Sequence, residues 1–264
     1  HDAGLDIRGS DMAESSNTLT LRERGIPIHI GHSADNVTDD ISFVIRTAAV
    51  HDDNPEVHEA HRRGIPVFER TQAWGALMRG YQNALCISGT HGKTTTTSMC
   101  THIMMAAEKD PTVMIGGTLP LLKACHRVGK GNTIIMESCE YYNSFLALNP
   151  TIAVVLNIEA DHLDFFKDLE DIKHSFRCFA ERVPAETGTV IANYDDANTM
   201  DALRGIARKV ITFGLNAKAD VYAQNIVHRG SVSEFDIYHR GNYFARVTLH
   251  VPGIHLSLIH ISEP

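Results

Sequence analysis

The sequence predicts an α/β protein with a mostly parallel β-sheet and a small antiparallel sheet near its C-terminal end. Three observations support this prediction. Apolar, strand-like segments alternate with helical segments along most of the 264 residues. A Gly-x-x-Gly-Lys-Thr stretch lies between one of these strands and the next helix. From Asp220 onward, apolar and polar residues alternate in consecutive segments with no helix between them, which is typical of antiparallel strands.

Residues 1 to about 80 predict a small α/β domain with parallel strands. Asn54-Pro55 marks the start of a helix that Gly64 ends, because proline suits the first turn and glycine suits the residue after the last. The apolar run at 41–49 predicts a strand that is buried on both faces. The other elements expected here are a strand at 5–8, a polar helix that ends near residue 24, and two strands that open with Gly-Ile-Pro, at 25–30 and 64–70.

A second series of elements begins at Asn83. A strand at 84–88 is followed by a helix at 93–107, and two later helices are expected at 169–182 and 195–208. The remaining predicted strands lie at 111–117, 132–138, 151–158, 188–193 and 209–214, followed by antiparallel strands at 219–227, 231–241 and 242–251.

The composition argues against several classes of function. The chain has 24 Lys and Arg residues against 32 Asp and Glu residues, a net charge of −8, so we expect no nucleic-acid partner. No stretch of about 20 apolar residues occurs, so we expect no membrane span. The five cysteines include no Cys-x-x-Cys pair, which favours a reducing cytoplasm over a disulfide framework. Nothing in the sequence indicates a protein partner.

The stretch SGTHGKTTTT predicts a binding site for nucleotide phosphates. Glycines let backbone N–H groups turn toward an anion, the N-terminus of the following helix adds partial positive charge, and a lysine adds a full charge. Thr94 is placed where its hydroxyl can bind Mg²⁺. Ile87 stands where the longer standard motif has glycine, and a glycine-rich turn with an exposed lysine is the alternative interpretation. The predicted ATP-binding residues are Gly89, Thr90, His91, Gly92, Lys93, Thr94 and Thr95.

Polar residues also follow two other predicted strands. Glu137 and Glu140 lie at the end of the strand at 132–138, and a cluster from Asn157 to His162 follows the next strand. Ligands of open α/β sheets gather at the carboxyl ends of the strands. Mg²⁺ prefers oxygen ligands and keeps several waters, so one carboxylate is enough, and we expect Glu140 to supply it while Glu137 ends its strand. On chemistry alone, His162 is as readily a hydrogen-bonded loop residue as a metal ligand.

Seven motifs together resemble the Mur ligases, the ATP-dependent amino-acid ligases of peptidoglycan precursor synthesis. The resemblance extends from Leu5 to His255. It implies a Rossmann-like UDP-sugar-binding domain at 1–82, truncated at its N-terminus, and a P-loop ATPase domain at 83–255, truncated at its C-terminus. Residues 256–264 are expected to be a non-native tail. The motifs, in chain order, are GSD, IGH, TAAVHDDNPEV, GTHGKTTTT, ESCEYYNSFL, LNIEADHLDFF and NYDDAN.

The resemblance also implies residue roles and a reaction. Lys93 would hold ATP phosphates, Thr94 and Glu140 would bind one Mg²⁺, and His162 would serve a second ion; Lys93, Glu140 and His162 are the expected catalytic residues. The reaction would join the lactyl carboxylate of UDP-N-acetylmuramate to L-alanine through an acyl phosphate. The residues expected to bind the sugar-nucleotide substrate are Asp11, His32, Thr47 and Asn157.

Three alternatives stay open at this point. A related recycling ligase joins a whole tripeptide to the same nucleotide-sugar and shares the GTHGKT loop. A phosphate-loop kinase or NTPase switch would use the same phosphate site without an amine. A nucleotide-binding fragment without turnover is the third, and we expect the 264-residue chain itself to be inactive as a ligase.

Overall fold

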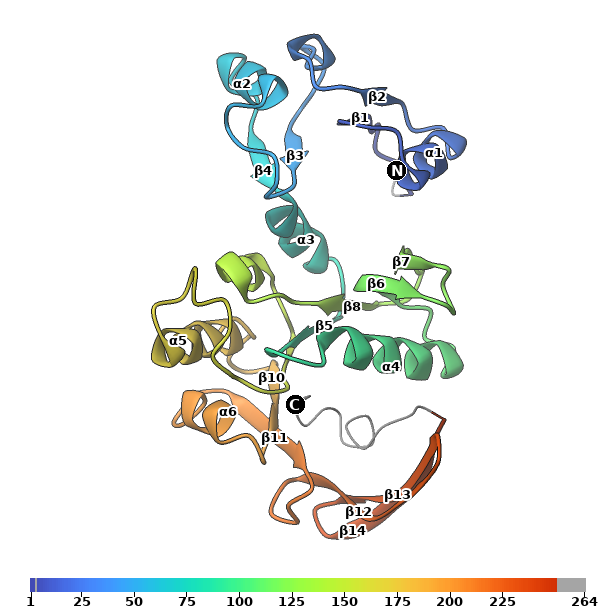
Figure 1. Cartoon of the computed structure of the whole chain (residues 1–264), viewed down its shortest axis with the longest axis vertical. Coiled ribbons are helices and arrows are strands. Elements are labelled where there is room, and N and C mark those ends of the chain that lie inside the picture. The colour runs from blue at the N-terminus through green and yellow to red at the C-terminus, as the bar shows by residue number, and fades with distance from the viewer. Residues whose placement is uncertain (3, 251–264) are drawn as a thin grey trace. The chain divides into compact units, whose positions relative to one another are not determined.

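The computed structural model describes residues 1–2 and 4–250, which form two compact units (Figure 1). One unit spans His1–Trp74 and the other begins at Gly75. The boundary falls inside helix α3, Arg70–Met78.

Within the part of the chain that the structure describes, no helix is both long and apolar enough to cross a membrane. The expected tail at 256–264 lies outside the described residues. The domain limits expected from the sequence, with a boundary after residue 82, remain a prediction.

The first unit confirms the parallel strands, but as two separate pairs. Strand β1 (Gly9–Asp11) lies parallel to β2 (Ile28–Ile30), and β3 (Val44–Arg46) lies parallel to β4 (Val67–Glu69). The helices of this unit are α1 (Ser16–Glu23), the short η1 (Ala34–Asn36) and α2 (Pro55–Arg62).

Two details of the sequence prediction were wrong in this unit. The first strand is β1 rather than residues 5–8, since Gly9 pairs with Ile28 and the preceding partner, Pro27, has no N–H to continue the ladder. The apolar run at 41–49 gives only the short β3 and is not buried on both faces, because Ile45 is 48% exposed. A two-stranded sheet has one covered face here, where Val44 packs toward a small core formed by Val37, Ala60 and Ile65.

Helix α2 begins and ends where the sequence indicated. The side chain of Asn54 accepts a hydrogen bond from the Glu56 N–H at 2.9 Å, and Pro55 occupies the first turn. Gly64 follows with a φ of 70°, a conformation that glycine adopts without strain. Local chemistry alone therefore sets both ends of this helix.

The first unit should lose stability at acidic pH through Glu59 on α2. Its carboxylate accepts hydrogen bonds from Arg62 Nε at 2.6 Å and Arg63 Nε at 2.5 Å, and these contacts lower the pKa of Glu59 to about 2. Because the folded-state pKa is depressed below its ordinary value of 4.5, the stabilisation is present above that pH and is lost as the pH falls toward 2. We expect the urea midpoint to fall more steeply over this window in the unaltered chain than in Glu59→Gln; equal slopes would contradict this.

The second unit is built on one ten-stranded sheet. At its centre β5 (Asn83–Ser88) lies between β8 (Thr133–Glu137) and β9 (Ile152–Val155), parallel to both. In spatial order the strands are β14 (Asn242–Leu249), β13 (Val232–His239), β12 (Val221–Arg229), β11 (Lys209–Gly214), β10 (Thr189–Asn193), β9, β5, β8, β6 (Thr112–Leu119) and β7 (Ala124–Arg127).

The predicted α/β class, with a mostly parallel sheet and antiparallel strands near the C-terminal end, is confirmed. The antiparallel strands β12 to β14 are joined to the parallel part because β12 pairs with β11 through Phe213 opposite Val221 and Gly214 opposite Tyr222. The sequence analysis did not predict β7, which pairs antiparallel with β6 at the opposite edge of the sheet.

Three α-helices and a short 3₁₀ segment accompany the sheet: α4 (Lys93–Ala106), α5 (Leu169–Ala180), α6 (Ala197–Ala202) and η2 (Tyr141–Ala147). Helix α4 packs against β5, β6 and β8, and α5 packs against β9 and η2. Helix α6 is much shorter than the predicted helix at 195–208, because Gly205 takes a left-handed φ of 70° soon after the helix ends.

Three phenylalanines form an almost fully buried cluster between η2 and α5. Phe145 stacks on Phe179 with ring centroids 4.6 Å apart, and Phe176 meets Phe145 edge to face at 5.3 Å. We expect Phe179→Ala to lower the free energy of unfolding by about 3–5 kcal/mol, because it removes a ring and leaves a cavity. Phe244→Ala is the matched control, since that ring is 72% exposed and should change stability by under about 0.5 kcal/mol. Similar losses in guanidinium unfolding of both variants would contradict the prediction.

The strand order places a topological switch beside β5. From β5 the chain passes through α4 to β6, returns to β8, and then crosses β5 to reach β9 on its other side. Ile87 pairs with Glu137, and Ser88 pairs with Val155, so the carboxyl ends of the three strands lie level. This is the position where ligands of open α/β sheets bind.

Candidate functional site

The predicted phosphate loop lies between β5 and α4, as the sequence indicated. Gly92 caps α4 with a φ of 82°, and Gly89 has a φ of 145°. A Cβ on Gly89 would lie 2.9 Å from Cβ of Leu156 and 3.2 Å from the backbone nitrogen of Asn157. Both the conformation and the close approach therefore require glycine at position 89.

The segment after β9 holds this loop in place. The side-chain Oδ1 of Asn157 accepts a hydrogen bond from the His91 N–H at 2.8 Å, and its Nδ2 donates to the His91 carbonyl at 3.1 Å. The Asn157 carbonyl accepts the Thr90 N–H at 3.1 Å, and the Glu159 N–H donates to Thr90 Oγ1 at 2.9 Å. Asn157 is 3% exposed, and both the oxygen and the nitrogen of its side-chain amide form hydrogen bonds with the loop. Its expected contact with substrate stays a prediction.

Lys93 lies over the loop and pairs with Glu140. Its ammonium donates to the carbonyls of Gly89 at 2.6 Å and Thr90 at 3.1 Å, and to Glu140 Oε2 at 3.0 Å. The Glu140 side chain is 2% exposed. The structure thus brings two of the three expected catalytic residues into direct contact.

Glu137, rather than Glu140, lies against Thr94. The Thr94 hydroxyl donates to Glu137 Oε1 at 2.8 Å, and the Gly116 N–H donates to Oε2 at 2.6 Å. The sequence analysis placed Glu137 at the end of its strand and expected Glu140 to be the metal ligand. The contact with Thr94 makes Glu137 a second candidate, at the carboxyl end of a strand that pairs with β5.

The two histidines of the site face carboxylates. His162 Nε2 lies 3.9 Å from Glu140 Oε1, and His91 Nε2 lies 3.7 Å from Glu159 Oε2. The expected catalytic residues Lys93, Glu140 and His162 therefore gather around one carboxylate. Thr95, the last of the expected ATP-binding residues, lies half-buried in the first turn of α4.

The oxygen groups beside the loop fit Mg²⁺ better than a softer metal. Among the described residues, no group of three or more His, Cys, Asp and Glu side chains is arranged to hold a metal ion. The contact between the Thr94 hydroxyl and the Glu137 carboxylate supplies two hard oxygen donors. Mg²⁺ binds in such settings through one or two protein oxygens together with substrate phosphates.

In the first unit, Asp11 and His32 come together at one end of the β1–β2 pair. Asp11 accepts the Gly31 N–H through its carbonyl at 2.8 Å, and His32 Nδ1 lies 3.2 Å from both Ser10 Oγ and Glu56 Oε2. Thr47 follows β3 on the other sheet, and its carbonyl accepts the Val50 N–H at 3.0 Å. The sequence did not single out Ser10 or Glu56 as neighbours of His32.

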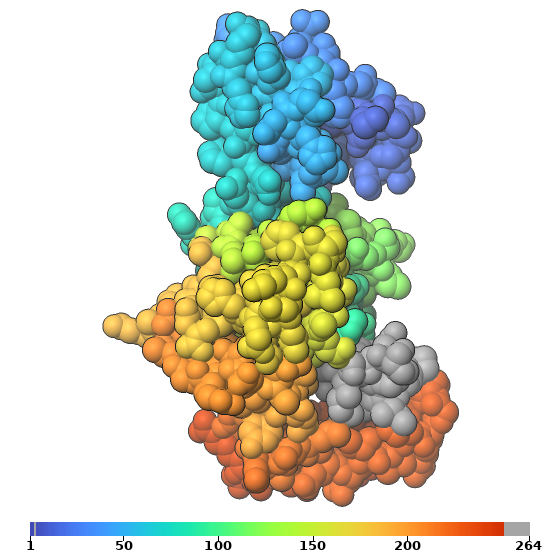
Figure 2. Space-filling model, turned by 60° about the vertical axis from the view of Figure 1, so that its left-hand side comes forward, coloured from blue at the N-terminus to red at the C-terminus, as the bar shows by residue number. Residues whose placement is uncertain are grey.

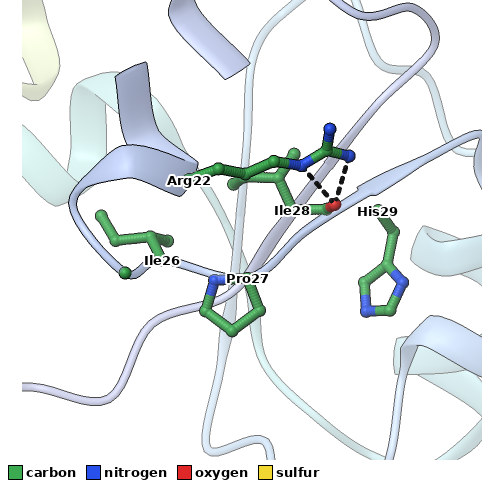
Figure 3. Close-up of a pocket in the computed structure, with 6 residues that line it drawn as sticks. Arg22, Ile26, Pro27, Ile28 and His29 are labelled. Atoms are coloured by element: carbon green, nitrogen blue, oxygen red, sulfur yellow. Dashed lines mark hydrogen bonds between the residues drawn. The ribbon is translucent and has the colours of Figure 1, made fainter. Parts of the chain in front are cut away.

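A shallow hollow in the first unit contains none of the expected site residues (Figure 3). Its arginine is already engaged, since Arg22 Nε and Nη2 donate to the Ile28 carbonyl at 3.3 Å and 2.8 Å. The hollow therefore carries no chemistry of its own. Its lining consists of Arg22, Gly25, Ile26, Pro27, Ile28 and His29.

Two family models together match nearly all of the chain. The family model described as "Mur ligase middle domain" matches residues 87–257, and that described as "Mur ligase family, catalytic domain" matches residues 1–82. The chain is 43% identical over 253 residues to the UDP-N-acetylmuramate–L-alanine ligase of Caldicellulosiruptor saccharolyticus, covering 96% of this chain and 55% of that protein. It is 40% identical over 254 residues to the ligase of the same name from Clostridium perfringens, again covering 96% and 55%.

Solved structures show the same similarity. The UDP-N-acetylmuramate–alanine ligase of Thermotoga maritima superposes with a TM-score of 0.80 at 29% identity, covering 98% of this chain and 58% of that one. A UDP-N-acetylmuramate:L-alanyl-γ-D-glutamyl-meso-diaminopimelate ligase from Neisseria meningitides gives a TM-score of 0.82 at 24% identity, covering 97% and 83%, and so shares the fold. The chain spans about half the length of the curated relatives it matches.

Proposed function

This chain belongs to the Mur ligase family, and from that premise we propose that it takes part in the ATP-dependent joining of UDP-N-acetylmuramate to L-alanine. The amide would form between the lactyl carboxylate of the sugar-nucleotide and the amine of the amino acid. The curated relatives named above carry the name of this activity.

One observation in the structure carries the proposal: Lys93 lies in a phosphate loop whose neighbouring strand ends present two carboxylates. Glu140 contacts the Lys93 ammonium and Glu137 contacts Thr94. A loop, an ammonium group and oxygen ligands at the ends of parallel strands are the parts that phosphoryl transfer from ATP needs.

The proposed reaction asks the protein for positioning and charge neutralisation. The lactyl carboxylate attacks the γ-phosphorus of ATP, which releases ADP and forms an acyl phosphate. The amine then attacks the acyl carbon, and phosphate leaves as the nitrogen loses its proton. Since the carboxylate is already a nucleophile, no side chain has to form a covalent intermediate. When ATP binds, the Lys93 ammonium would release its hydrogen bonds to Glu140 and the loop carbonyls and would donate to phosphate oxygens instead. The backbone N–H groups of the loop would bind the same phosphates.

Thr94 and Glu140 would bind one Mg²⁺ and His162 would serve a second. The contact between Thr94 and Glu137 adds Glu137 as a further oxygen donor beside the first ion. Bound there, Mg²⁺ supplies positive charge beside the oxygens of the transferred phosphoryl group. The Thr94–Glu137 contact of 2.8 Å supports Glu137 as the added donor. The 3.9 Å separation between His162 Nε2 and Glu140 Oε1 supports a place for His162 beside the carboxylate of the first ion.

The proposal extends to the roles of the two domains, the location of the protein and the residues that contact substrate. Residues 1–82 would bind the UDP-sugar and 83–255 would bind ATP, limits that the two family matches support. The five free cysteines support a location in the cytoplasm. The residues proposed to contact the sugar-nucleotide are Asp11, His32, Thr47 and Asn157.

The test uses the complete reading frame that contains this sequence. The purified product receives UDP-N-acetylmuramate, ATP and Mg²⁺ with either L-alanine or the tripeptide, and products are identified by mass. We expect UDP-N-acetylmuramoyl-L-alanine, with phosphate release that depends on both the carboxylate and the amine. Product with the tripeptide alone would favour the recycling ligase, and phosphate transfer without an amine would favour a kinase.

A further inference from the structure

Tyr141 and His162 form a stacked pair beside Glu140. Their ring centroids are 4.4 Å apart and the ring planes meet at 27°. Tyr141 follows Glu140 directly in the chain, whereas His162 comes from the segment between β9 and α5, which forms part of the surface shown in yellow in Figure 2. The pair therefore joins two segments that each contribute a residue to the proposed site.

The backbone of His162 is fixed by its own turn, but its ring is not. The His162 carbonyl accepts the N–H groups of Phe165 and Phe166, each at 2.9 Å, and its φ is 52°, a conformation that non-glycine residues rarely adopt. The nearest carboxylate oxygens, from Glu140 and Asp161, both lie 3.9 Å from Nε2, beyond hydrogen-bond distance. Among the described residues, the Tyr141 ring is the group that stacks on the imidazole.

Tyr141 is itself anchored from two directions. Its hydroxyl donates a hydrogen bond to the Asp164 carboxylate. Its ring lies 4.3 Å from the Tyr142 ring and meets Phe165 edge to face at 6.1 Å. Since Asp164 is two residues from His162, the same loop that carries the histidine also fixes the tyrosine.

We propose that Tyr141 and Asp164 act as a clamp that orients the His162 ring toward Glu140. Tyr141 is a positioning residue in this role and touches no reacting group. The inference rests on the proposed function, in which His162 serves a metal ion, because partners that orient a metal ligand commonly change metal affinity about 10–100-fold when they are removed.

The first measurement is metal-free. The proton resonances of the His162 ring, assigned by their loss in His162→Ala, should show the ring-current shift that a stacked phenol produces. We expect Tyr141→Leu to move them toward the position of free imidazole, while Leu163→Ala, an exposed neighbour at 60% exposure, leaves them in place. Resonances that do not move in Tyr141→Leu would overturn the clamp.

The second measurement follows Mn²⁺ binding to the 264-residue chain by electron paramagnetic resonance, with a non-hydrolysable ATP analogue present. Tyr141→Leu should weaken Mn²⁺ binding roughly 10-fold, and Tyr141→Phe, which keeps the ring and loses the hydroxyl, should weaken it less. In a His162→Ala background, Tyr141→Leu should cause no further loss, because the clamp acts through the histidine.

The outcomes separate the clamp from the proposed function. An equal loss of Mn²⁺ affinity from Tyr141→Leu in both backgrounds, or a change within twofold of the unaltered chain, would overturn the positioning role. If the unaltered chain bound no Mn²⁺ together with the analogue, the proposed function would fail instead. The ring-current measurement would then still decide whether Tyr141 orients His162.

Discussion

Lys93→Met is expected to abolish ATP binding and to destabilise the second unit at the same time. Nucleotide binding is lost because the loop keeps its backbone donors but loses its only full positive charge. Stability falls because the Glu140 side chain, 2% exposed and 3.0 Å from Lys93, is left as an unpaired buried carboxylate. Breaking a buried ion pair from one side costs about 3–5 kcal/mol. Calorimetric nucleotide titration and urea unfolding measure the two effects.

A double variant separates the loss of nucleotide binding from the loss of stability in Lys93→Met. Adding Glu140→Gln to Lys93→Met removes the unpaired charge, so stability should recover in part while nucleotide binding stays absent. Lys167→Met is the matched control, since Lys167 is an exposed lysine of the same unit. If Lys93→Met bound ATP as the unaltered chain does, the phosphate site would be wrongly assigned.

Gly89→Ala is expected to weaken nucleotide binding roughly 10-fold or more, because moving the loop weakens its backbone hydrogen bonds to the charged phosphates, each worth about 1.5–3 kcal/mol. The methyl group would meet Leu156 Cβ at 2.9 Å, and the φ of 145° is one that alanine rarely adopts. The loop or the start of the segment after β9 must therefore move. The free energy of unfolding should also fall by about 1–3 kcal/mol, because the backbone at position 89 is strained in the folded state.

Gly117→Ala provides the control for this prediction. It lies in β6 close to the same site, but its added Cβ would meet Thr94 Cγ2 at an ordinary 3.7 Å. We expect its nucleotide affinity to stay close to that of the unaltered chain in the same titration. An equal loss in both variants would show that any added methyl near the loop weakens binding, and that the conformation of Gly89 is not the cause.

Local chemistry explains which parts of the fold and site could be predicted. Helix α2 was predicted within two residues because Asn54, Pro55 and Gly64 act on their own neighbours. The position of the loop between β5 and α4 was predicted from equally local features: two glycines, a lysine and the flanking strand and helix. The strand at 5–8 was misplaced because its true start depends on Pro27, a residue of the partner strand.

The parts that could not be predicted depend on contacts between distant segments. Glu137 meets the Gly116 N–H and the Thr94 hydroxyl only because β6 and α4 lie beside its strand. Asn157 holds the loop only because β9 lies beside β5. No spacing pattern along the chain encodes these neighbours, since they follow from the strand order of the sheet.

The hydrogen bonds between Asn157 and the loop residues His91 and Thr90 have a consequence for how tightly a triphosphate can be held. A loop that is already ordered by the rest of the fold has little freedom left to lose when its ligand arrives, so more of the contact energy appears as affinity. A substitution that displaces β9, and with it Asn157, is therefore expected to weaken nucleotide binding by loosening the loop.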